Sequence, residues 1–518
     1  MIRGVTLLHD YLIDTAQLLP DKVALVSRGQ RLTYREIDQR SNALARGLVA
    51  RGVQRGDRVV VFCENGPEAV IAFWGVLKAN AVVVPVHPQT KPEKLAYLLG
   101  DSRASALVAD GSLARVFVEA AAGSKHLGSV IVVGPFDRER HHALREVSSW
   151  DEAARRGEVG GAPERRCIDV DLAAIIYTSG STGEPKGVML THRNMLTAAT
   201  SITTYLENVR DDVILNVLPL SFDYGLYQMI MAFKVGARLV LEKSFAYPAE
   251  VLARVVQEEV TGFPGVPTVF AMMSDMKTIG DYDFSRVRYV SNTAAALPVK
   301  HILRLKDIFP RARIFSMYGL TECKRCTYLP PEDLDRKPTS VGIPIPNTEA
   351  WIVDDNGEKV PPNTIGQLVV RGATVMSGYW EKPEATAKKL RPGPLPGELV
   401  LYTGDYCTMD EEGYVTFVGR MDDIIKSRGE KVPPKEVEHA LMSVRGVKEA
   451  AVIGVDDDVL GQAPKAFVVL EEGASLDESE LRRECQLRLE SYMVPKWIEI
   501  AASLPRSGNG KIDKRALA

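Results

Sequence analysis

The sequence YTSGSTGEPKG, residues 177–187, decides how the rest of the chain is interpreted. It follows the apolar run 172–176, which predicts a buried strand. Its glycines permit positive φ, so backbone N–H groups can converge on one point, and its hydroxyl groups and Lys186 add further donors. The segment therefore predicts a loop at a strand end that binds a polyphosphate.

This loop differs from a Walker A loop, in which Lys and then Ser or Thr directly follow the second glycine. Here Lys186 lies between Pro185 and Gly187, so the spacing does not match. A flexible, solvated Gly/Ser loop is the alternative interpretation. The remainder of the chain has to decide between the two.

Composition indicates an ordinary globular protein. The chain has 518 residues, 45% of them hydrophobic and 25% charged, which is enough for more than one domain with a sizeable core. A net charge of -3 gives no overall basic excess that would favour nucleic acid or an acidic membrane as a partner. We expect neither nucleic acid nor a membrane span, and oligomeric state cannot be inferred.

Cysteine usage and the N-terminus point to one compartment. The six cysteines are mostly scattered through apolar or helical contexts, and the single pair Cys323 and Cys326 has no partner pair at metal spacing. The first residues lack the apolar core of a signal peptide, and no run approaches the ~20 apolar residues of a membrane span. We expect a reduced, cytoplasmic protein without a zinc site.

Strands and helices alternate over the first part of the chain. Thr33 and Glu36 have capping-box spacing before a helical pattern, and a strand, a helix at 67–78 and another strand follow. Apolar strand patterns then recur up to MYG at 317–319, which predicts parallel-rich sheets flanked by helices. In such α/β folds ligands bind at the carboxyl ends of strands, where the phosphate loop lies.

The pattern changes after residue 337. Short β-rich pieces with Pro and Gly turns fill 338–405, including a hairpin signal at Asp355-Asn356-Gly357. After Gly419, a strand and turn, a helix opened by Pro433 and Pro434, two strands and a helix beginning at Asp477 predict a small α+β domain. We place the boundary so that 1–420 is the large N-terminal domain, with its β-rich subdomain, and 421–518 the small C-terminal domain.

Several stretches in one order resemble a known family. They are TSGSTGEPKG (178–187), MYGLTE (317–322), GYW (378–380), YTGD (402–405), GRMDDIIKSRG (419–429) and GNGKIDK (508–514). Together they resemble the adenylate-forming (ANL) superfamily of AMP-dependent ligases, which includes acyl-CoA synthetases, peptide-synthetase adenylation domains and firefly luciferase. The runs VMLTHRNM and LPLSFDYG are most similar to bacterial acyl-CoA ligase-like proteins, including those associated with exosortase systems.

The resemblance implies a reaction in two steps. A carboxylate attacks the α-phosphate of ATP, pyrophosphate leaves, and the acyl group of the resulting adenylate passes to a thiol. Charge that develops on the phosphoryl oxygens must be met by fixed donors and Mg²⁺. The expected cofactors are therefore ATP, Mg²⁺ and CoA, or a phosphopantetheine thiol in place of CoA.

The resemblance also implies roles for individual residues. The loop from Thr178 to Lys186 would hold the β- and γ-phosphates, Tyr318 would stack on adenine, Thr321 would bind the α-phosphate, and Glu322 with Thr178 would hold Mg²⁺. Asp405 and Arg420 would bind the ribose. The implied nucleotide-binding set is Thr178, Ser179, Gly180, Ser181, Thr182, Gly183, Lys186, Ala294, Ala295, Tyr318, Gly319, Asp405, Arg420 and Lys511. Ala294 and Ala295 stand where relatives carry a Gly-Gly or Gly-Ala pair, so their contacts are the weaker inference.

Structural alternatives exist at these positions. Tyr318 at a strand end could be a packing residue, Glu322 could be a first-turn helix acid, and Asp405 could be a turn residue. Lys511 near the C-terminus could be a solvated surface charge. By resemblance, Lys511 is instead catalytic together with Thr321 and Glu322, and a rotation about the hinge Asp422 withdraws it between the two steps.

The acid itself is less clear from the sequence. We expect Phe222, Asp223, Phe263 and Ala294 to contact it. In amino-acid-activating relatives an aspartate at the place of Asp223 binds the substrate amine, and the alternative is that Asp223 caps the helix that follows. The main hypothesis is a small or medium carboxylic acid transferred to CoA.

Two rivals remain within the ligase class, and one outside it. The first is activation of an amino acid or amino-aryl acid for an acyl or peptidyl carrier protein, and the second is activation of an unusual acid without CoA transfer. Outside the class lies a non-catalytic nucleotide-binding protein. Such a protein is expected to lose Lys511, Glu322 or Asp405, all of which this chain retains.

Overall fold

The structure is a computed structural model. It describes residues 5–137, 144, 146–155, 161–179, 184–293, 299–427, 430–457, 461–489, 491–506 and 512–517. By its contacts the chain divides into two compact units, 1–349 with 370–401 and 350–369 with 402–518. The boundary between residues 420 and 421 inferred from the sequence stays a prediction.

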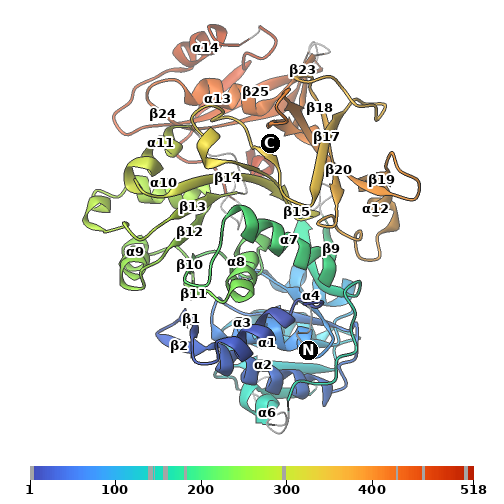
Figure 1. The fold of residues 1–518 in the computed structure, drawn as a ribbon. Helices are drawn as coiled ribbons and strands as arrows, with labels where there is room; N and C mark the ends of the chain where they lie inside the picture. Colours follow the sequence, from blue (N-terminus) through green and yellow to red (C-terminus); the bar gives the residue numbers. More distant parts are fainter. Residues whose placement is uncertain are drawn as a thin grey trace. The chain divides into compact units, whose positions relative to one another are not determined.

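The first unit contains a sheet made from the N-terminal part of the chain (Figure 1). Its strand order is β7 (Val147–Ser149), β6 (Ser129–Val133), β5 (Ala106–Asp110), β3 (Arg58–Phe62), β4 (Val82–Pro85), β8 (Leu172–Ser179) and β9 (Pro185–Thr191). These neighbours are parallel except β8 and β9, which form an antiparallel hairpin at one edge. The phosphate-loop sequence therefore joins two strands of a hairpin.

Helices cover this sheet as the sequence predicts. Apolar residues of α4 (Pro92–Asp101) and α5 (Ala114–Ala122) form one core with side chains of β3 to β6. The capping box at Thr33 and Glu36 is present and begins α2 (Tyr34–Val49), which packs on α3 (Pro67–Lys78). The remaining helices of the first unit are α1 (Asp10–Leu18), α6 (Trp150–Arg155), α7 (His192–Tyr205), α8 (Asp223–Val235), α9 (Pro248–Gln257), α10 (Pro267–Ser274), α11 (Val299–Ile308) and α12 (Pro383–Lys389).

A second sheet of the same unit runs through the middle of the chain. Its order is β16 (Ile343–Pro344), β15 (Cys323–Leu329), β14 (Arg313–Leu320), β13 (Tyr289–Asn292), β12 (Gly262–Gly265), β10 (Val213–Asn216), β11 (Arg238–Leu241), β1 (Val23–Ser27) and β2 (Gln30–Thr33). The pairs from β14 to β1 are parallel, and the outer pairs are antiparallel. The predicted parallel-rich α/β architecture is confirmed.

A third, β-rich sheet follows, as predicted from the Pro- and Gly-rich stretch. Its strands pair in the order β17 (Thr348–Val353), β18 (Gly366–Gly372), β20 (Leu399–Met409) and β19 (Leu390–Pro392), and β21 (Val415–Arg420) also pairs with β20. The Asp-Asn-Gly signal lies in a turn that a bridge between Val353 and Lys359 closes.

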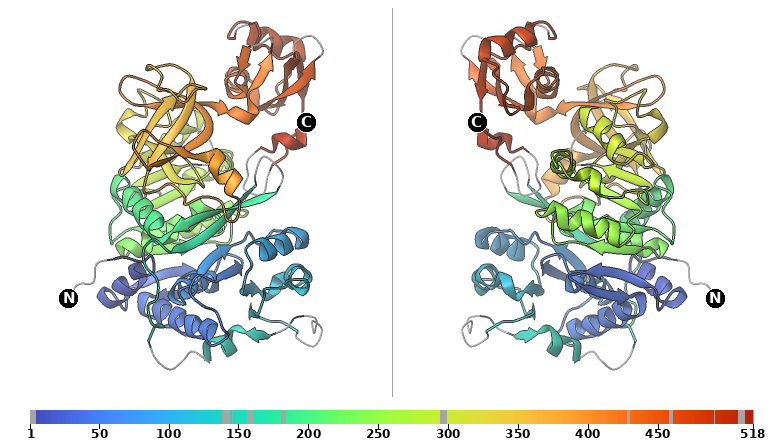
Figure 2. Two further views of the ribbon diagram at one scale, coloured as in Figure 1. Left: turned by 90° about the vertical axis from the view of Figure 1, so that its right-hand side faces the viewer. Right: turned by 90° about the vertical axis from the view of Figure 1, so that its left-hand side faces the viewer.

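The C-terminal part of the second unit has a core of its own. Strands pair in the order β23 (Glu430–Val432), β22 (Ile425–Ser427), β25 (Gly461–Leu470) and β24 (Val447–Asp457), and β26 (Trp497–Ile500) joins β25. Apolar side chains of α13 (Pro434–Met442) and α14 (Glu478–Gln486) pack with those of the strands, and Figure 2 shows these helices against the sheet. The predicted α+β character is confirmed. Among the described residues, no helix is long and apolar enough to cross a membrane.

Candidate active site

The predicted phosphate-binding sequence connects the two strands of the β8–β9 hairpin. Thr178 is paired with Lys186 and Ser179 with Pro185, so the two ends of the loop are held side by side. The predicted contacts Gly180, Ser181, Thr182 and Gly183 lie outside the described residues. The hairpin thus brings the hydroxyl residue Thr178 next to Lys186, two groups that can donate hydrogen bonds to phosphate oxygens.

A tight contact holds the base of this hairpin. The Trp380 N–H donates to the Gly187 carbonyl at 2.7 Å. A Cβ on Gly187 would lie 2.6 Å from Ile175 Cγ2 and 3.3 Å from Trp380 Cβ, so only glycine allows this approach. The GYW stretch therefore contributes to the site by packing on the strand that carries Lys186.

The second hairpin, β14–β15, carries the other predicted nucleotide contacts. Tyr318 at the end of β14 is partly exposed and pairs with Thr327, so it is not a fully buried core residue. A Cβ on Gly319 would lie 2.8 Å from the Arg325 Cα, which requires glycine here. Thr321 and Glu322 form the turn between the strands. Glu322 is therefore a hairpin-turn residue, and not the first-turn helix acid of the alternative interpretation.

Tyr379 joins the two hairpins. Its hydroxyl donates to Glu322 Oε1 at 2.6 Å, and the Lys186 Nζ lies 5.8 Å from the centre of its ring. Burial and the Glu322 carboxylate raise the pKa of Tyr379, so its hydroxyl stays a donor. The sequence indicated the GYW motif, but no role for Tyr379 followed from it.

The N-terminus of α8 presents the predicted acid contacts. Phe222 occupies the N-cap position without a side-chain cap, and Asp223 is the first helical residue. Asp223 Oδ1 accepts from the Tyr224 N–H at 2.9 Å, and Oδ2 accepts from Lys324 Nζ at 3.1 Å. The idea that Asp223 caps the helix is wrong in its detail, because Asp223 lies inside the first turn.

Phe263, another predicted acid contact, lies on a different element from Phe222 and Asp223. Phe263 is completely buried on β12, with ring centres of Phe270 and Phe309 at 6.2 and 5.5 Å. It packs in an aromatic core behind the strand. Ala294 and Ala295 lie outside the described residues.

The predicted ribose contacts lie together in the second unit. Asp405 on β20 pairs with Arg420 on β21, and the Arg420 Nε lies 3.8 Å from Asp405 Oδ1. The Asp405 N–H donates to Thr403 Oγ1 at 3.1 Å, and Thr403 donates in turn to the Leu368 carbonyl. Strand pairing thus fixes the carboxylate beside the guanidinium.

The hinge residue and the terminal lysine are described only through their surroundings. Asp422 lies in a short 3₁₀ helix directly after β21, and Lys511 is outside the described residues. A bridge between Arg506 and Ile512 closes the segment that contains Lys511, and the Lys514 Nζ lies 2.7 Å from the buried Glu438 carboxylate. Both ends of the lysine segment are therefore attached to the C-terminal fold.

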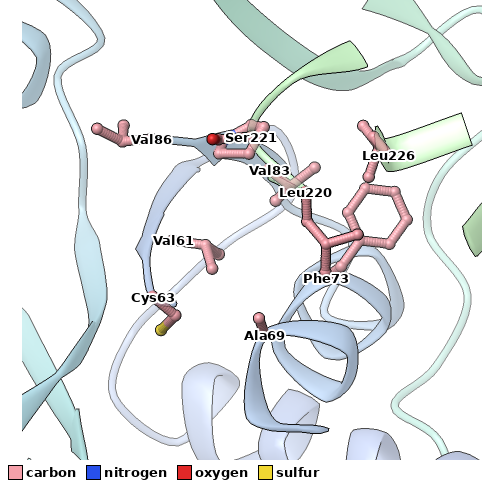
Figure 3. Close-up of a pocket in the computed structure, with 10 residues that line it drawn as sticks. Val61, Cys63, Ala69, Phe73, Val83, Val86, Leu220, Ser221 and Leu226 are labelled. Carbon is pink, nitrogen blue, oxygen red and sulfur yellow. The ribbon is translucent and has the colours of Figure 1, made fainter. Parts of the chain in front are cut away.

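An apolar pocket lies beneath the stretch that precedes Asp223 (Figure 3). Val61, Cys63, Phe73, Leu220 and Leu226 line it, and Ser221 contributes the hydroxyl seen at its upper side. Burial raises the pKa of the Cys63 thiol, which disfavours the thiolate form. Phe222 and Asp223 are not among the described residues that line this pocket, so it is separate from the predicted acid contacts.

Cys323 and Cys326 on β15 are both completely buried, and neither forms a disulfide. The Cys323 Sγ lies 3.5 Å from Thr374 Oγ1. Among the described residues there is no group of three or more His, Cys, Asp or Glu side chains arranged to hold a metal ion.

Two family models match the chain. The model for AMP-binding enzymes matches residues 12–380, and the model for the AMP-binding enzyme C-terminal domain matches residues 436–511. A long-chain-fatty-acid–CoA ligase of Bacillus subtilis (strain 168) is 32% identical, over 98% of this chain and 94% of the relative. Tyrocidine synthase 3 of Brevibacillus parabrevis is 31% identical, over 98% of this chain but 8% of that much longer protein.

Solved structures of similar proteins have the same fold. The anthranilate CoA ligase AuaEII, solved in complex with anthranoyl-AMP, superposes with a TM-score of 0.88 at 28% identity, covering 99% of this chain and 96% of that one. Its bound acyl adenylate is the intermediate that the sequence motifs imply. The chain therefore belongs to the AMP-binding enzyme family, as a ligase that adenylates a carboxylic acid with ATP and passes the acyl group to a thiol.

Proposed function

We propose that the two hairpins joined by Tyr379 hold the triphosphate and the metal of the adenylation step. The observation that supports this is the arrangement of Lys186, Tyr379 and Glu322, which places a cation and a carboxylate near one aromatic ring. Lys186 and the loop from Thr178 to Gly183 bind the β- and γ-phosphates. Glu322 and Thr178 are the ligands for Mg²⁺, whose preference for oxygen donors they satisfy.

The remaining nucleotide contacts follow from the same assignment. Tyr318, Gly319, Ala294 and Ala295 contact adenine, Thr321 donates to the α-phosphate, and Asp405 with Arg420 binds the ribose. When bound, Mg²⁺ supplies positive charge against the phosphoryl oxygens. The hydrogen-bond donors of the protein also stabilise the phosphoryl oxygens, whose negative charge increases as pyrophosphate leaves.

Lys511 is the catalytic lysine of the first step in this proposal. It would donate to the acid carboxylate and the α-phosphate, where a fixed cation is worth ~10²-fold or more in rate. A rotation about Asp422 then removes it, and a thiol attacks the acyl adenylate with AMP as the leaving group. The Lys514–Glu438 pair supports the role by anchoring the segment that follows Lys511.

The acid is a small or medium carboxylic acid, and CoA is its acceptor. Phe222 and Asp223 contact the acid, and Ala294 and Phe263 remain predicted contacts. The amine-binding alternative for Asp223 is weakened because Lys324, an ammonium of the chain itself, already lies 3.1 Å from its carboxylate.

A carrier-protein thiol remains the second candidate acceptor, since a peptide synthetase is among the relatives. The cytoplasmic location stays a prediction.

Separating the two half-reactions tests this assignment. Lys511→Ala is expected to lower acid-dependent pyrophosphate exchange by ~10²-fold or more, while thioester formation from supplied acyl adenylate and CoA persists. Lys448→Ala, at an exposed position of the same fold, is the matched control and should change neither reaction. Unchanged exchange in the Lys511 variant would refute the role of this lysine. Transfer to a carrier protein but not to CoA would identify the second candidate acceptor.

A further inference from the structure

Two consecutive cations are buried on β15, directly after Glu322 and Cys323. Lys324 is 2% exposed and Arg325 is 7% exposed. Lysine and arginine are almost never buried to this extent unless they are paired, because removing a charge from water is costly. Each of the two therefore requires a partner.

Lys324 has such a partner within the chain. Its Nζ lies 3.1 Å from Asp223 Oδ2 and 5.9 Å from the centre of the Tyr227 ring. Burial lowers the pKa of Lys324, and the Asp223 carboxylate opposes that shift. The negative charge of Asp223 therefore stabilises the buried ammonium group of Lys324.

Arg325 lacks an equivalent partner in the described part of the chain. Its Nη1 donates to the Met317 Sδ at 3.0 Å, a weak acceptor, and its guanidinium lies 4.5 Å from the centre of the Tyr224 ring. The guanidinium also lies beside the Tyr205 hydroxyl, with which it interacts through its charge and a side-chain hydrogen bond. The buried Nη2 has no hydrogen-bond partner, and no described carboxylate lies within ion-pairing distance. The guanidinium therefore has donor capacity that no described group satisfies.

The backbone holds Arg325 in place. Its φ is +56°, a left-handed conformation that is unfavourable for a residue with a side chain. The Gly319 backbone on the neighbouring strand approaches so closely that an added Cβ would lie 2.8 Å from the Arg325 Cα. The hairpin therefore fixes the backbone of Arg325, from which the side chain with its guanidinium extends.

Arg325 lies near the residues that are predicted to contact the substrate acid. It lies three residues after Glu322 along the same hairpin, and it stacks on Tyr224, which directly follows Asp223. Glu322 faces the Tyr379 hydroxyl, and Asp223 is occupied by Lys324. Arg325 is thus the cation near the predicted acid contacts whose charge no described carboxylate balances.

We propose that the acid carries a second carboxylate besides the one that is adenylated, and that Arg325 binds this second group. The inference rests on the proposed function, because it takes α8 and the β14–β15 hairpin as walls of the acid site. A carboxylate accepts two parallel hydrogen bonds from a guanidinium, and removal from water strengthens this pair. A substrate ammonium would instead meet Lys324 and Arg325 and be repelled.

Matched pairs of acids test the proposal with the wild-type enzyme. Acid-dependent pyrophosphate exchange is measured for butanoate against succinate and for hexanoate against adipate. The diacid of at least one pair is expected to have a kcat/KM higher by ~10²-fold or more, because a site that leaves a buried donor unpaired rejects the analogue lacking the acceptor. Exchange with monocarboxylates, amino acids or phosphorylated acids but not with diacids would overturn the proposal and leave the adenylation function intact. Exchange with none of these carboxylic acids would overturn this proposal and also the proposal of a small or medium acid.

Variants of Arg325 separate recognition from folding. Arg325→Met is expected to remove the preference for the diacid, with roughly 10²-fold lower kcat/KM for it, while the KM for ATP and the rate with the monoacid stay within about threefold. Arg325→Lys keeps the charge and should recover part of the preference. Arg313→Met, at a half-exposed arginine of the same hairpin, is the matched control and should leave the preference unchanged. An unchanged diacid preference in Arg325→Met would refute the role, and if that variant does not fold, the wild-type pairs and Arg325→Lys still decide.

Discussion

Each parallel sheet of the first unit ends in an antiparallel hairpin, and the two hairpins handle charge in opposite ways. The β8–β9 hairpin has Thr178 and Lys186 half-exposed near its tip. The β14–β15 hairpin buries two cations, Lys324 and Arg325, behind its turn at Glu322. The first is suited to a highly charged, hydrated triphosphate, and the second to one group that has been removed from water.

Under the proposed assignments, this contrast means that the two ends of the substrate site are specified differently. Phosphate binding depends on local composition, because glycines, hydroxyls and a lysine can act together wherever the loop is ordered. Selection of the acid depends on burial, because a cation discriminates strongly only where water is excluded. Tyr379 contacts both regions, so it is the point at which changes in one are expected to reach the other.

The largest expected effect comes from removing the charge at the turn of the second hairpin. Glu322→Gln is expected to lower acid-dependent pyrophosphate exchange by roughly 10²- to 10³-fold and to raise the Mg²⁺ concentration needed for half-maximal rate. Exchange kinetics over a Mg²⁺ series measure both. Glu332→Gln, at a largely exposed acid beyond β15, should behave as the wild type. Wild-type Mg²⁺ dependence in Glu322→Gln would mean that the two hairpins do not share the metal.

A larger side chain at Gly187 is expected to disrupt the packing at the base of the β8–β9 hairpin. Gly187→Ala places a Cβ against Ile175 and Trp380 and is expected to destabilise the fold by about 1–3 kcal/mol, the usual range for overpacking. Thermal unfolding measures this change. Gly100→Ala is the matched control, because that helical glycine has open space around it and alanine there should be neutral or stabilising. Equal melting temperatures for the two variants would show that the contact with Trp380 does not constrain the hairpin.

The segment after the first hairpin predicts a pH effect. Burial lowers the pKa of His192 to about 4, below its ordinary value of 6.5, and its Nδ1 accepts from the Leu8 N–H at 3.0 Å. The unfolded chain therefore binds a proton that the folded chain does not, so stability present above pH ~6.5 is lost as the pH falls towards 4. This histidine alone should cost about 2 kcal/mol between pH 7 and pH 5.

Denaturant titrations at several pH values measure this slope. His192→Asn can keep an acceptor near Leu8 but does not titrate, so its stability should fall less steeply with acid than that of the wild type. His126→Asn removes an exposed histidine and is the control. An unchanged slope in His192→Asn would contradict the assignment. The neighbouring buried His9, whose pKa is also lowered by burial, contributes to the slope that remains.

The smallest expected effect concerns the connection between the hairpins. Tyr379→Phe removes the hydroxyl that donates to Glu322 but keeps the ring near Lys186. We expect a decrease of about tenfold in kcat/KM for exchange, in line with the loss of one hydrogen bond to a charged group. Steady-state kinetics test this, with the largely exposed Tyr247→Phe as control. If Tyr379→Phe lowered kcat/KM as much as Glu322→Gln does, Tyr379 would have a role beyond orienting the Glu322 carboxylate.

Local patterns predicted much of the fold. The capping box at Thr33, the helix that begins at Asp477, the helix at 67–78 and the alternation of strands and helices are all present. These features depend on residues close in sequence, namely a cap and its partner three residues on, or apolar residues at a regular spacing. They could therefore be inferred without knowing what packs against them.

The contents of the acid site could not be inferred in this way. In the sequence TECKRC, Lys324 and Arg325 look like two ordinary surface charges, and Asp223 looks like a helix cap or an amine ligand. Their burial and pairing arise only when β15 packs beside α8, more than 80 residues distant in the chain. Phe263 shows the converse, because its aromatic neighbours Phe270 and Phe309 place it in the core.

The sequence by itself predicted a phosphate-binding loop from residue types at short spacings, and the order of its motifs carried the family resemblance that implied the class of reaction. Only the tertiary structure decided that Glu322 meets Tyr379 and that Asp223 meets Lys324. It also left the Arg325 Nη2 without a hydrogen-bond partner. The physical reason is that the energy of a charge depends on how much water surrounds it, and packing between distant segments sets that amount.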